Sequence, residues 1–162
     1  DMVKRAQWYE AIALVALVLL LSFVVRATLF TVIRVDGDSM RATLSDGDLL
    51  AVAIPGLKLA GARRGDVVIC HYPGDRNLYV KRVVALPGDL VAVRRGLLFL
   101  NGHYVKEGYL SSLGGPAFGP SIVPDASVFV LGDNRANSAD SRLEGIGFLR
   151  DSELVGRVEW VL

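Results

Sequence analysis

Residues 78–105 read LYVKRVVALPGDLVAVRRGLLFLNGHYV, and this stretch decides the fold class. Short apolar runs alternate in it with the turn formers Pro, Gly, Asp and Asn, which is typical of antiparallel strands. Asn101-Gly102 favours a two-residue type I′ turn, because both residues accept a positive φ. The strands predicted here are Leu78–Leu86, Leu90–Arg94, Leu97–Leu100 and His103–Val105, the last two forming a hairpin. The pattern therefore predicts a mainly β fold.

The same pattern of short strands continues on both sides of this stretch. Four further strands are predicted: Asp48–Ile54, Asp66–Tyr72, Ser127–Leu131 and Leu154–Leu162. Residues 111–125 are rich in Gly, Pro and Ser and are predicted to form a loop. We therefore expect residues 34–162 to form one antiparallel, barrel-like β domain, with a small inserted region at about residues 92–125.

The N-terminal part has a different character. Residues 11–25 carry no charged side chain, and the stretch from Trp8 to about Leu29 reaches the roughly 20 residues that a membrane-spanning helix needs. Residues 1–33 are therefore predicted to be a membrane anchor with a transmembrane helix at about 8–29. A cleavable signal peptide ending near Val25-Arg26-Ala27 and an internal core helix are the alternatives. Basic residues balance on the two sides, so their count does not fix the orientation.

The remaining composition excludes several classes of function. The 18 Lys and Arg residues against 17 Asp and Glu give a net charge of +1, which offers no basic surface for nucleic acid. The single cysteine, Cys70, excludes an intrachain disulfide and a cysteine-based zinc site, and is predicted to be a core residue. The two histidines, His71 and His103, are too far apart to suggest a metal cluster. Neither a metal nor another cofactor is predicted.

The segment Gly37–Leu44 reads GDSMRATL and places Ser39 in a flexible turn before an apolar residue. A serine there can be exposed with its backbone N–H facing a cleft, as a nucleophile in acyl transfer requires. A lone serine in such a turn is more commonly a turn or helix-cap residue.

The predicted strand around Lys81 carries a cation on each face. Tyr79, Lys81 and Val83 share one face, while Arg82 lies on the other. If the Lys81 face points inward, loss of hydration favours the neutral amine, lowers its pKa and allows it to act as a base. Arg82 stays protonated and cannot do so. An edge strand with Lys81 in solvent is the alternative.

The segment Gly132–Arg142, GDNRANSADSR, combines turn formers with two carboxylates and two arginines. Such a loop can stabilise itself by charge-assisted hydrogen bonds and hold a hydroxyl in a fixed place. A solvated loop is the alternative, and the spacing does not match a calcium-binding EF-hand.

In this order and spacing, the three segments resemble those of type I signal peptidases, membrane-bound serine proteases that use a Ser-Lys dyad. The resemblance runs over nearly the whole chain and outweighs the commoner interpretations of Ser39 and Lys81. It also includes Arg64-Gly65-Asp66-Val67-Val68, Asn101-Gly102 and Gly156-Arg157-Val158. The short stretch between the lysine segment and the Gly132–Arg142 loop resembles the smaller Gram-positive-type members.

The resemblance implies a β-rich catalytic domain on the outer face of the cytoplasmic membrane, held by a single-pass anchor. It implies that the enzyme removes signal peptides from exported preproteins. Its partners would be preprotein signal peptides and the lipid bilayer, with the secretion translocon as a further candidate and no nucleic acid.

The resemblance also implies roles for individual residues. Ser39 would be the nucleophile, with its own N–H in the oxyanion hole, and Lys81 would be the general base, oriented by Ser138. Two ion pairs would brace the loop: Asp140 with Arg142, and Asp133 with Arg82. The shallow pockets for small substrate side chains would be lined by Ile33, Val35, Met40, Leu44, Tyr79 and Val80.

Two positions depart from the family pattern. Ala42 stands where members usually have proline, which makes the turn after the nucleophile less rigid. Gly37 stands where some relatives carry a serine that adds an oxyanion donor. A self-cleaving repressor-type Ser-Lys protease and a catalytically silent, membrane-tethered β scaffold that binds exported chains are the alternative functions.

Overall fold

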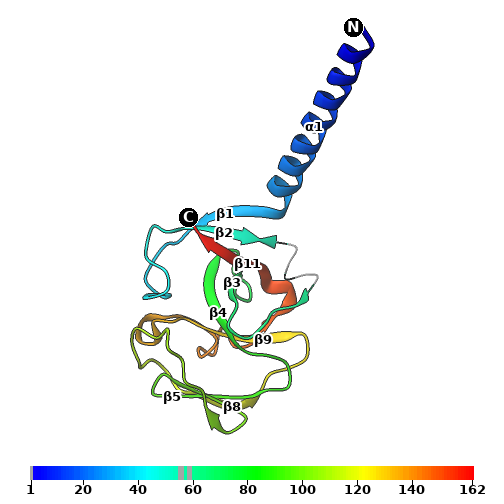
Figure 1. The fold of residues 1–162 in the computed structure, drawn as a ribbon. Coiled ribbons are helices and arrows are strands. Elements are labelled where there is room, and N and C mark those ends of the chain that lie inside the picture. The colour runs from blue at the N-terminus through cyan, green and yellow to red at the C-terminus, as the bar shows by residue number, and fades with distance from the viewer. Residues whose placement is uncertain (1, 55–56, 58–59) are drawn as a thin grey trace.

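The structure is a computed structural model that describes residues 2–54, 57 and 60–162. It has one long helix followed by two antiparallel sheets (Figure 1). The larger sheet has seven strands in the order β1-β2-β11-β3-β4-β9-β10, and the smaller has four in the order β7-β6-β5-β8. The elements are α1 (Met2–Leu29), β1 (Phe30–Arg34), β2 (Leu49–Ala53), β3 (Val67–Cys70), β4 (Tyr79–Ala85), β5 (Leu90–Arg94), β6 (Leu97–Leu100), β7 (His103–Tyr104), β8 (Phe118–Ile122), β9 (Ser127–Leu131), β10 (Leu149–Arg150) and β11 (Leu154–Val161), with short 3₁₀ turns at Arg135–Asn137 and Asp151–Glu153.

This architecture confirms the predicted mainly β, antiparallel fold. The larger sheet is open, with β1 and β10 as its edges, whereas a barrel-like sheet was expected. The smaller sheet, β5 to β8, covers most of the region predicted as an insertion.

Three groups of buried apolar side chains hold the sheets together. One lies between the two sheets and includes Phe129 of β9 and Val91 of β5. A second lies under β3, β4 and β9 and includes Cys70, which is buried as expected. The third includes Met40 and Leu50 and lies beneath the turn that carries Ser39. Burial of apolar area of this kind is the main favourable contribution to folding.

The predicted hairpin is present, with β6 and β7 paired and Leu100 opposite His103. The prediction of a loop over residues 111–125 is wrong in part, because β8 pairs with β5. Its sequence, FGPSI, does not indicate a strand, because Gly and Pro are uncommon in strands. Both are tolerated because β8 is an edge strand. Gly119 is also needed for close approach, since a Cβ there would come within 2.3 Å of the Val91 carbonyl oxygen.

The segment that joins the helix to the β domain also differs from expectation. Residues 30–33, predicted as the end of the anchor, belong to β1, which pairs along its whole length with β2. The β-branched residues Thr31, Val32 and Ile33 favour an extended backbone there. As a result, the chain passes from α1 through β1 to Ser39 within ten residues of Leu29.

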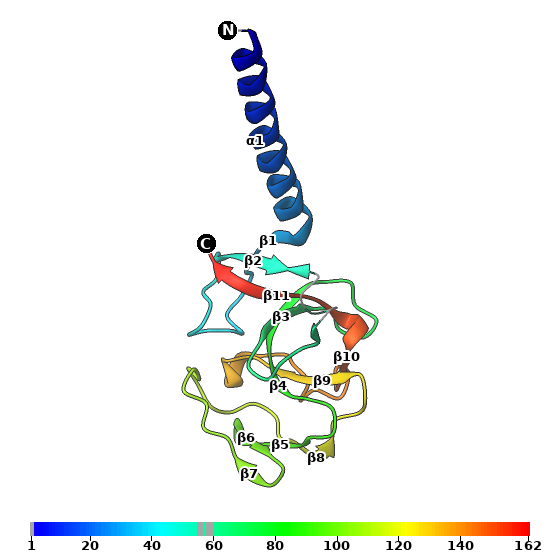
Figure 2. The same cartoon turned by 45° about the vertical axis from the view of Figure 1, so that its right-hand side comes forward.

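The helix α1 projects away from the sheets (Figures 1 and 2). Its apolar side chains between Trp8 and Val24 are exposed, among them Leu19 and Phe23. Within the part of the chain that the structure describes, no helix is both long enough and apolar enough to span a membrane.

Candidate active site

Ser39 and Lys81, 42 positions apart in the sequence, lie within hydrogen-bonding distance of each other. The distance between Lys81 Nζ and Ser39 Oγ is 2.8 Å. Ser39 lies in the turn that follows β1, and Lys81 lies in the middle third of β4. β1 and β4 are not neighbours in the sheet. The turn reaches β4 because Met40 and Leu44 pack in the core cluster that contains Ile69 of β3 and contacts Val80 of β4.

The environment of Lys81 favours the neutral amine. The residue is only 3% exposed, and its Nζ donates a second hydrogen bond of 2.8 Å to the Val80 carbonyl oxygen. Burial lowers the pKa of this amine, and coulombic interactions with Cys70, Asp140 and Asp133 oppose that shift without reversing it. No carboxylate forms an ion pair with Lys81 among the described residues, so a proton on it is poorly compensated.

Beside the pair lies a cleft of about 240 Å³. Of the six residues expected to line substrate pockets, four line this cleft: Ile33, Val35, Tyr79 and Val80. Met40 and Leu44 do not line this cleft; they are 1% and 3% exposed and pack in the core below it. Three apolar residues that the sequence analysis did not select also line the cleft: Leu50, Ile69 and Leu78.

The turn that carries Ser39 is bound to the Gly132–Arg142 loop. The Asn134 backbone N–H donates to the Ser39 carbonyl oxygen at 3.0 Å, and its side-chain amide donates to the Asp38 carbonyl oxygen at 3.1 Å. At Gly132 there is no room for a side chain, because a Cβ would lie 2.5 Å from the Ser39 carbonyl oxygen and 2.2 Å from Ser138 Oγ. Loop and turn are therefore in direct backbone contact.

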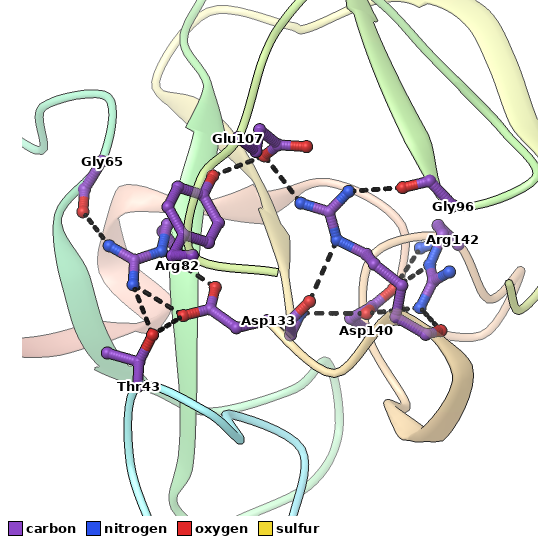
Figure 3. Close-up of polar contacts among 11 residues, drawn as sticks. Thr43, Gly65, Arg82, Gly96, Glu107, Asp133, Asp140 and Arg142 are labelled. Carbon is purple, nitrogen blue, oxygen red and sulfur yellow. Dashed lines mark hydrogen bonds and ion pairs between the residues drawn. The ribbon is translucent and has the colours of Figure 1, made fainter. Parts of the chain in front are cut away.

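An ion pair between Arg82 and Asp133 fixes one side of this contact (Figure 3). The guanidinium donates two hydrogen bonds to the carboxylate, at 2.9 and 2.6 Å, and one to the Gly65 carbonyl oxygen at 2.9 Å. Thr43, four residues after Ser39, donates to the same carboxylate at 2.5 Å. The bidentate geometry holds the end of the Ser39 turn against β4.

A second ion pair, between Asp140 and Arg142, is fully buried. Its two hydrogen bonds are 2.8 and 2.9 Å long, and Asp140 also accepts one from the Gly132 N–H at 3.1 Å. Arg142 donates further to the carbonyl oxygens of Gly114 and Arg135. Figure 3 shows Asp140 and Arg142 joined in this way.

Ser138 is the predicted site residue whose expected contact is missing. Its Oγ is buried without a hydrogen-bond partner, so it does not bond to Lys81 here. It nevertheless lies beside Gly132, close to the Ser39 turn.

The sequence analysis missed a third group of charged residues. Arg135, which is fully buried, donates to Glu107 at 2.7 Å and to the Gly132 carbonyl oxygen at 3.1 Å. Tyr109 donates to the same Glu107 oxygen, and its ring lies 4.0 Å from the Arg82 guanidinium carbon. Arg135 belongs to the Gly132–Arg142 segment that the sequence singled out. No pattern in the sequence indicates that its partner is Glu107, which follows β7 of the smaller sheet.

Metal ligands are not gathered at this site: within residues 2–54, 57 and 60–162, no three His, Cys, Asp or Glu side chains form a metal-binding group. The chemistry available is that of a hydroxyl, a buried amine and backbone N–H groups.

The family model described as "Signal peptidase, peptidase S26" matches residues 6–162. The chain belongs to this family. Signal peptidase I of Bacillus amyloliquefaciens is 37% identical over 95% of this chain and 85% of its own length. Signal peptidase I T of Bacillus subtilis strain 168 is 38% identical over 96% of this chain and 83% of its own length. Family membership confirms the predicted enzyme class, a serine protease, and the predicted activity, removal of signal peptides from preproteins.

A solved structure supports the same assignment. The crystal structure of a signal peptidase I from Enterococcus faecalis V583 is 28% identical and matches with a TM-score of 0.53. The match covers 60% of this chain and 97% of that one.

The two departures from the family pattern lie on either side of Ser39. Gly37 has a φ of +96°, and its N–H donates to the Asp46 side chain at 2.9 Å. Ala42 is exposed, between Arg41 and Thr43. Its neighbour Thr43, through its bond to Asp133, stabilises a turn that lacks the usual proline.

Gly132→Ala tests the close contact between loop and turn. The added Cβ must displace Ser138 or the Ser39 backbone, and a shift of about 1 Å at a catalytic group can lower a rate about a hundredfold. We expect kcat/KM for a signal-peptide substrate to fall by about that factor. Gly145→Ala is the matched control, since a Cβ there meets no atom within 4 Å. Equal activity of the two variants would show that the contact is unimportant.

Proposed function

We propose that Ser39 is the nucleophile and Lys81 the general base with which this enzyme cleaves signal peptides from exported preproteins. The observation that carries the proposal is the 2.8 Å distance between Lys81 Nζ and Ser39 Oγ in a buried site. A neutral amine at this distance accepts the hydroxyl proton, which activates the oxygen for attack.

The preprotein binds as an extended strand in the cleft beside Ser39. The edge of β1 that β2 leaves unpaired, together with the neighbouring Asp36, offers backbone groups for strand pairing. Val35 does not, because its N–H and its carbonyl oxygen bond to Asp48 and Gly47. The cleft is walled by Ile33, Tyr79 and Val80, and it takes small side chains at the first and third positions before the cut.

Cleavage then proceeds in two steps. Ser39 Oγ bonds to the carbonyl carbon while its proton moves to Lys81 Nζ, and the Ser39 N–H stabilises the negative oxygen. Lys81 returns the proton to the leaving amine, which frees the mature protein and leaves the signal peptide as an ester on Ser39. A water molecule, deprotonated by Lys81, attacks this ester and restores the free serine.

Ser138 orients the amine during these steps. Its Oγ is buried, has no other partner in the described structure, and lies beside the Gly132 backbone that contacts Ser39. When this hydroxyl accepts a hydrogen bond from the neutral Nζ, the single lone pair of the amine is directed at the Ser39 hydroxyl.

The enzyme is anchored in the cytoplasmic membrane by a single pass of α1, with the β domain on the outer side. The uncharged run 11–25 and the exposed apolar side chains of α1 support this placement. At the base of α1, Val32, Leu49 and Trp160 are also exposed, and Trp160 contacts the ring of Phe30. This apolar surface lies on β1, β2 and β11, so it would face the lipid and bring the cleft near the bilayer. Preproteins emerging from the translocon would meet the site there.

Ser39→Ala and Lys81→Ala test the dyad. Each removes one of the two reacting groups, so we expect cleavage of a labelled signal-peptide substrate by the purified enzyme to fall at least about a thousandfold. Ser152→Ala is the matched serine control, because Ser152 is exposed in the 3₁₀ turn Asp151–Glu153 and does not line the cleft. Retention of full activity by either dyad variant would contradict the assignment. It would leave a non-catalytic scaffold as the alternative.

The pH dependence tests the state of Lys81. Burial lowers the pKa of its amine, so the base is neutral at higher pH and becomes protonated as the pH falls through that lowered pKa. We expect kcat/KM to decrease about tenfold per pH unit on the acid side of it. Lys106→Ala, at an exposed lysine, should leave the profile unchanged. A flat acid side in a stably folded enzyme would contradict the mechanism.

Vesicle flotation tests the anchor. The full chain should float with phosphatidylcholine–phosphatidylglycerol vesicles after reconstitution. The variant Leu17→Lys with Leu19→Lys should float much less, because each charge at the centre of a spanning helix costs about 3 kcal/mol. Leu113→Lys, at an exposed loop residue, is the control. Flotation of the double variant equal to that of the parent would refute a spanning helix.

A further inference from the structure

Tyr72 lies directly behind one wall of the cleft. Its ring stacks on the ring of Tyr79, with centroids 3.9 Å apart and planes within 11°. Tyr79 lines the cleft together with Ser39 and Lys81, whereas Tyr72 is buried in the core beneath β3 and β4. The orientation of Tyr79 therefore depends on a residue that no substrate can touch.

The turn after Tyr72 holds Tyr79 from a second side. Tyr79 Oη donates to Asp75 at 2.6 Å, and the Asp75 N–H donates to the Tyr72 carbonyl oxygen at 3.0 Å. Ring stacking and the hydrogen bond together restrict both the plane of the Tyr79 ring and its depth in the wall. A fixed ring keeps the pocket small.

The hydroxyl of Tyr72 contacts the catalytic loop. It donates to the Ala139 carbonyl oxygen at 2.6 Å, between Ser138 and Asp140. Burial raises the pKa of this phenol, so it remains a protonated donor across the working pH range. One side chain thus joins the pocket wall to the segment that contains Ser138.

We propose that Tyr72 is a positioning residue with two separable effects: its ring sets how strictly the cleft selects small substrate side chains, and its hydroxyl holds the Ser138 segment in place for catalysis. This inference rests on the proposed function of the cleft and the dyad. It assigns a role in specificity to a residue outside the site.

Two variants separate the effects. Tyr72→Phe keeps the ring and removes the hydroxyl, leaving the Ala139 carbonyl unpaired. We expect kcat to fall about three- to tenfold with KM and side-chain preference unchanged. Tyr72→Leu removes the stack as well, so Tyr79 can move and the pocket can widen. Two substrates are compared that differ only in the residue directly before the cut, Ala or Val. The ratio of kcat/KM for the Ala substrate to kcat/KM for the Val substrate should then decrease about tenfold.

Both substrates are assayed with the full-length enzyme, and thermal unfolding confirms that each variant is folded. Phe148→Leu is the control, because it removes a packed aromatic ring from a cluster with Phe118 and Phe129 and should not change the Ala-to-Val ratio. A parental ratio in Tyr72→Leu overturns the role in selectivity. A parental kcat in Tyr72→Phe overturns the role of the hydroxyl, and this variant keeps the test decisive if the leucine variant does not fold. Failure of the proposed function itself is distinguishable, since Ser39→Ala would then cleave as well as the parent.

Discussion

The candidate site depends on the burial of one amine, that of Lys81. Lys81 is buried without a carboxylate partner among the described residues, and its Nζ contacts only the Ser39 hydroxyl and the Val80 carbonyl oxygen. Burial of a charged ammonium is costly, so this environment favours the neutral form. The acidic residues nearby, Asp133 and Asp140, could reverse that preference if they approached the amine. Each is instead bound to an arginine.

The arginines thus have two functions in this fold. They neutralise the carboxylates near Lys81. Their remaining N–H groups bind carbonyl oxygens of other segments of the chain. Arg135 does the same through Glu107, which connects the smaller sheet to the loop. Replacing a buried pair by apolar residues can stabilise a protein, so these pairs are best explained by the positions that they define. The turn that carries Ser39, the strand β4 that carries Lys81, and the smaller sheet meet at these ion pairs.

The path of the chain links the N-terminal helix to the candidate site. Because β1 begins where α1 ends and Ser39 follows five residues after β1, Ser39 lies close in sequence to the end of the helix. The edge of β1 that is free for strand pairing lies on the same short segment. Ser39, the free edge of β1 and the end of α1 therefore lie close together in the chain.

The sequence by itself determined the fold class, most strands and the hairpin at Asn101-Gly102, and it indicated Ser39 and Lys81 as candidates, because periodicity, turn residues and the family segments are local patterns. It did not reveal β8, whose strand depends on pairing with β5 and not on its own side chains. It also placed Met40 and Leu44 in the substrate pockets, although packing turns both into the core. Only the tertiary structure decided that Lys81 is buried, that Glu107 binds Arg135 and that Tyr72 supports Tyr79. Burial and long-range pairing depend on which segments meet in space, and no local pattern records that.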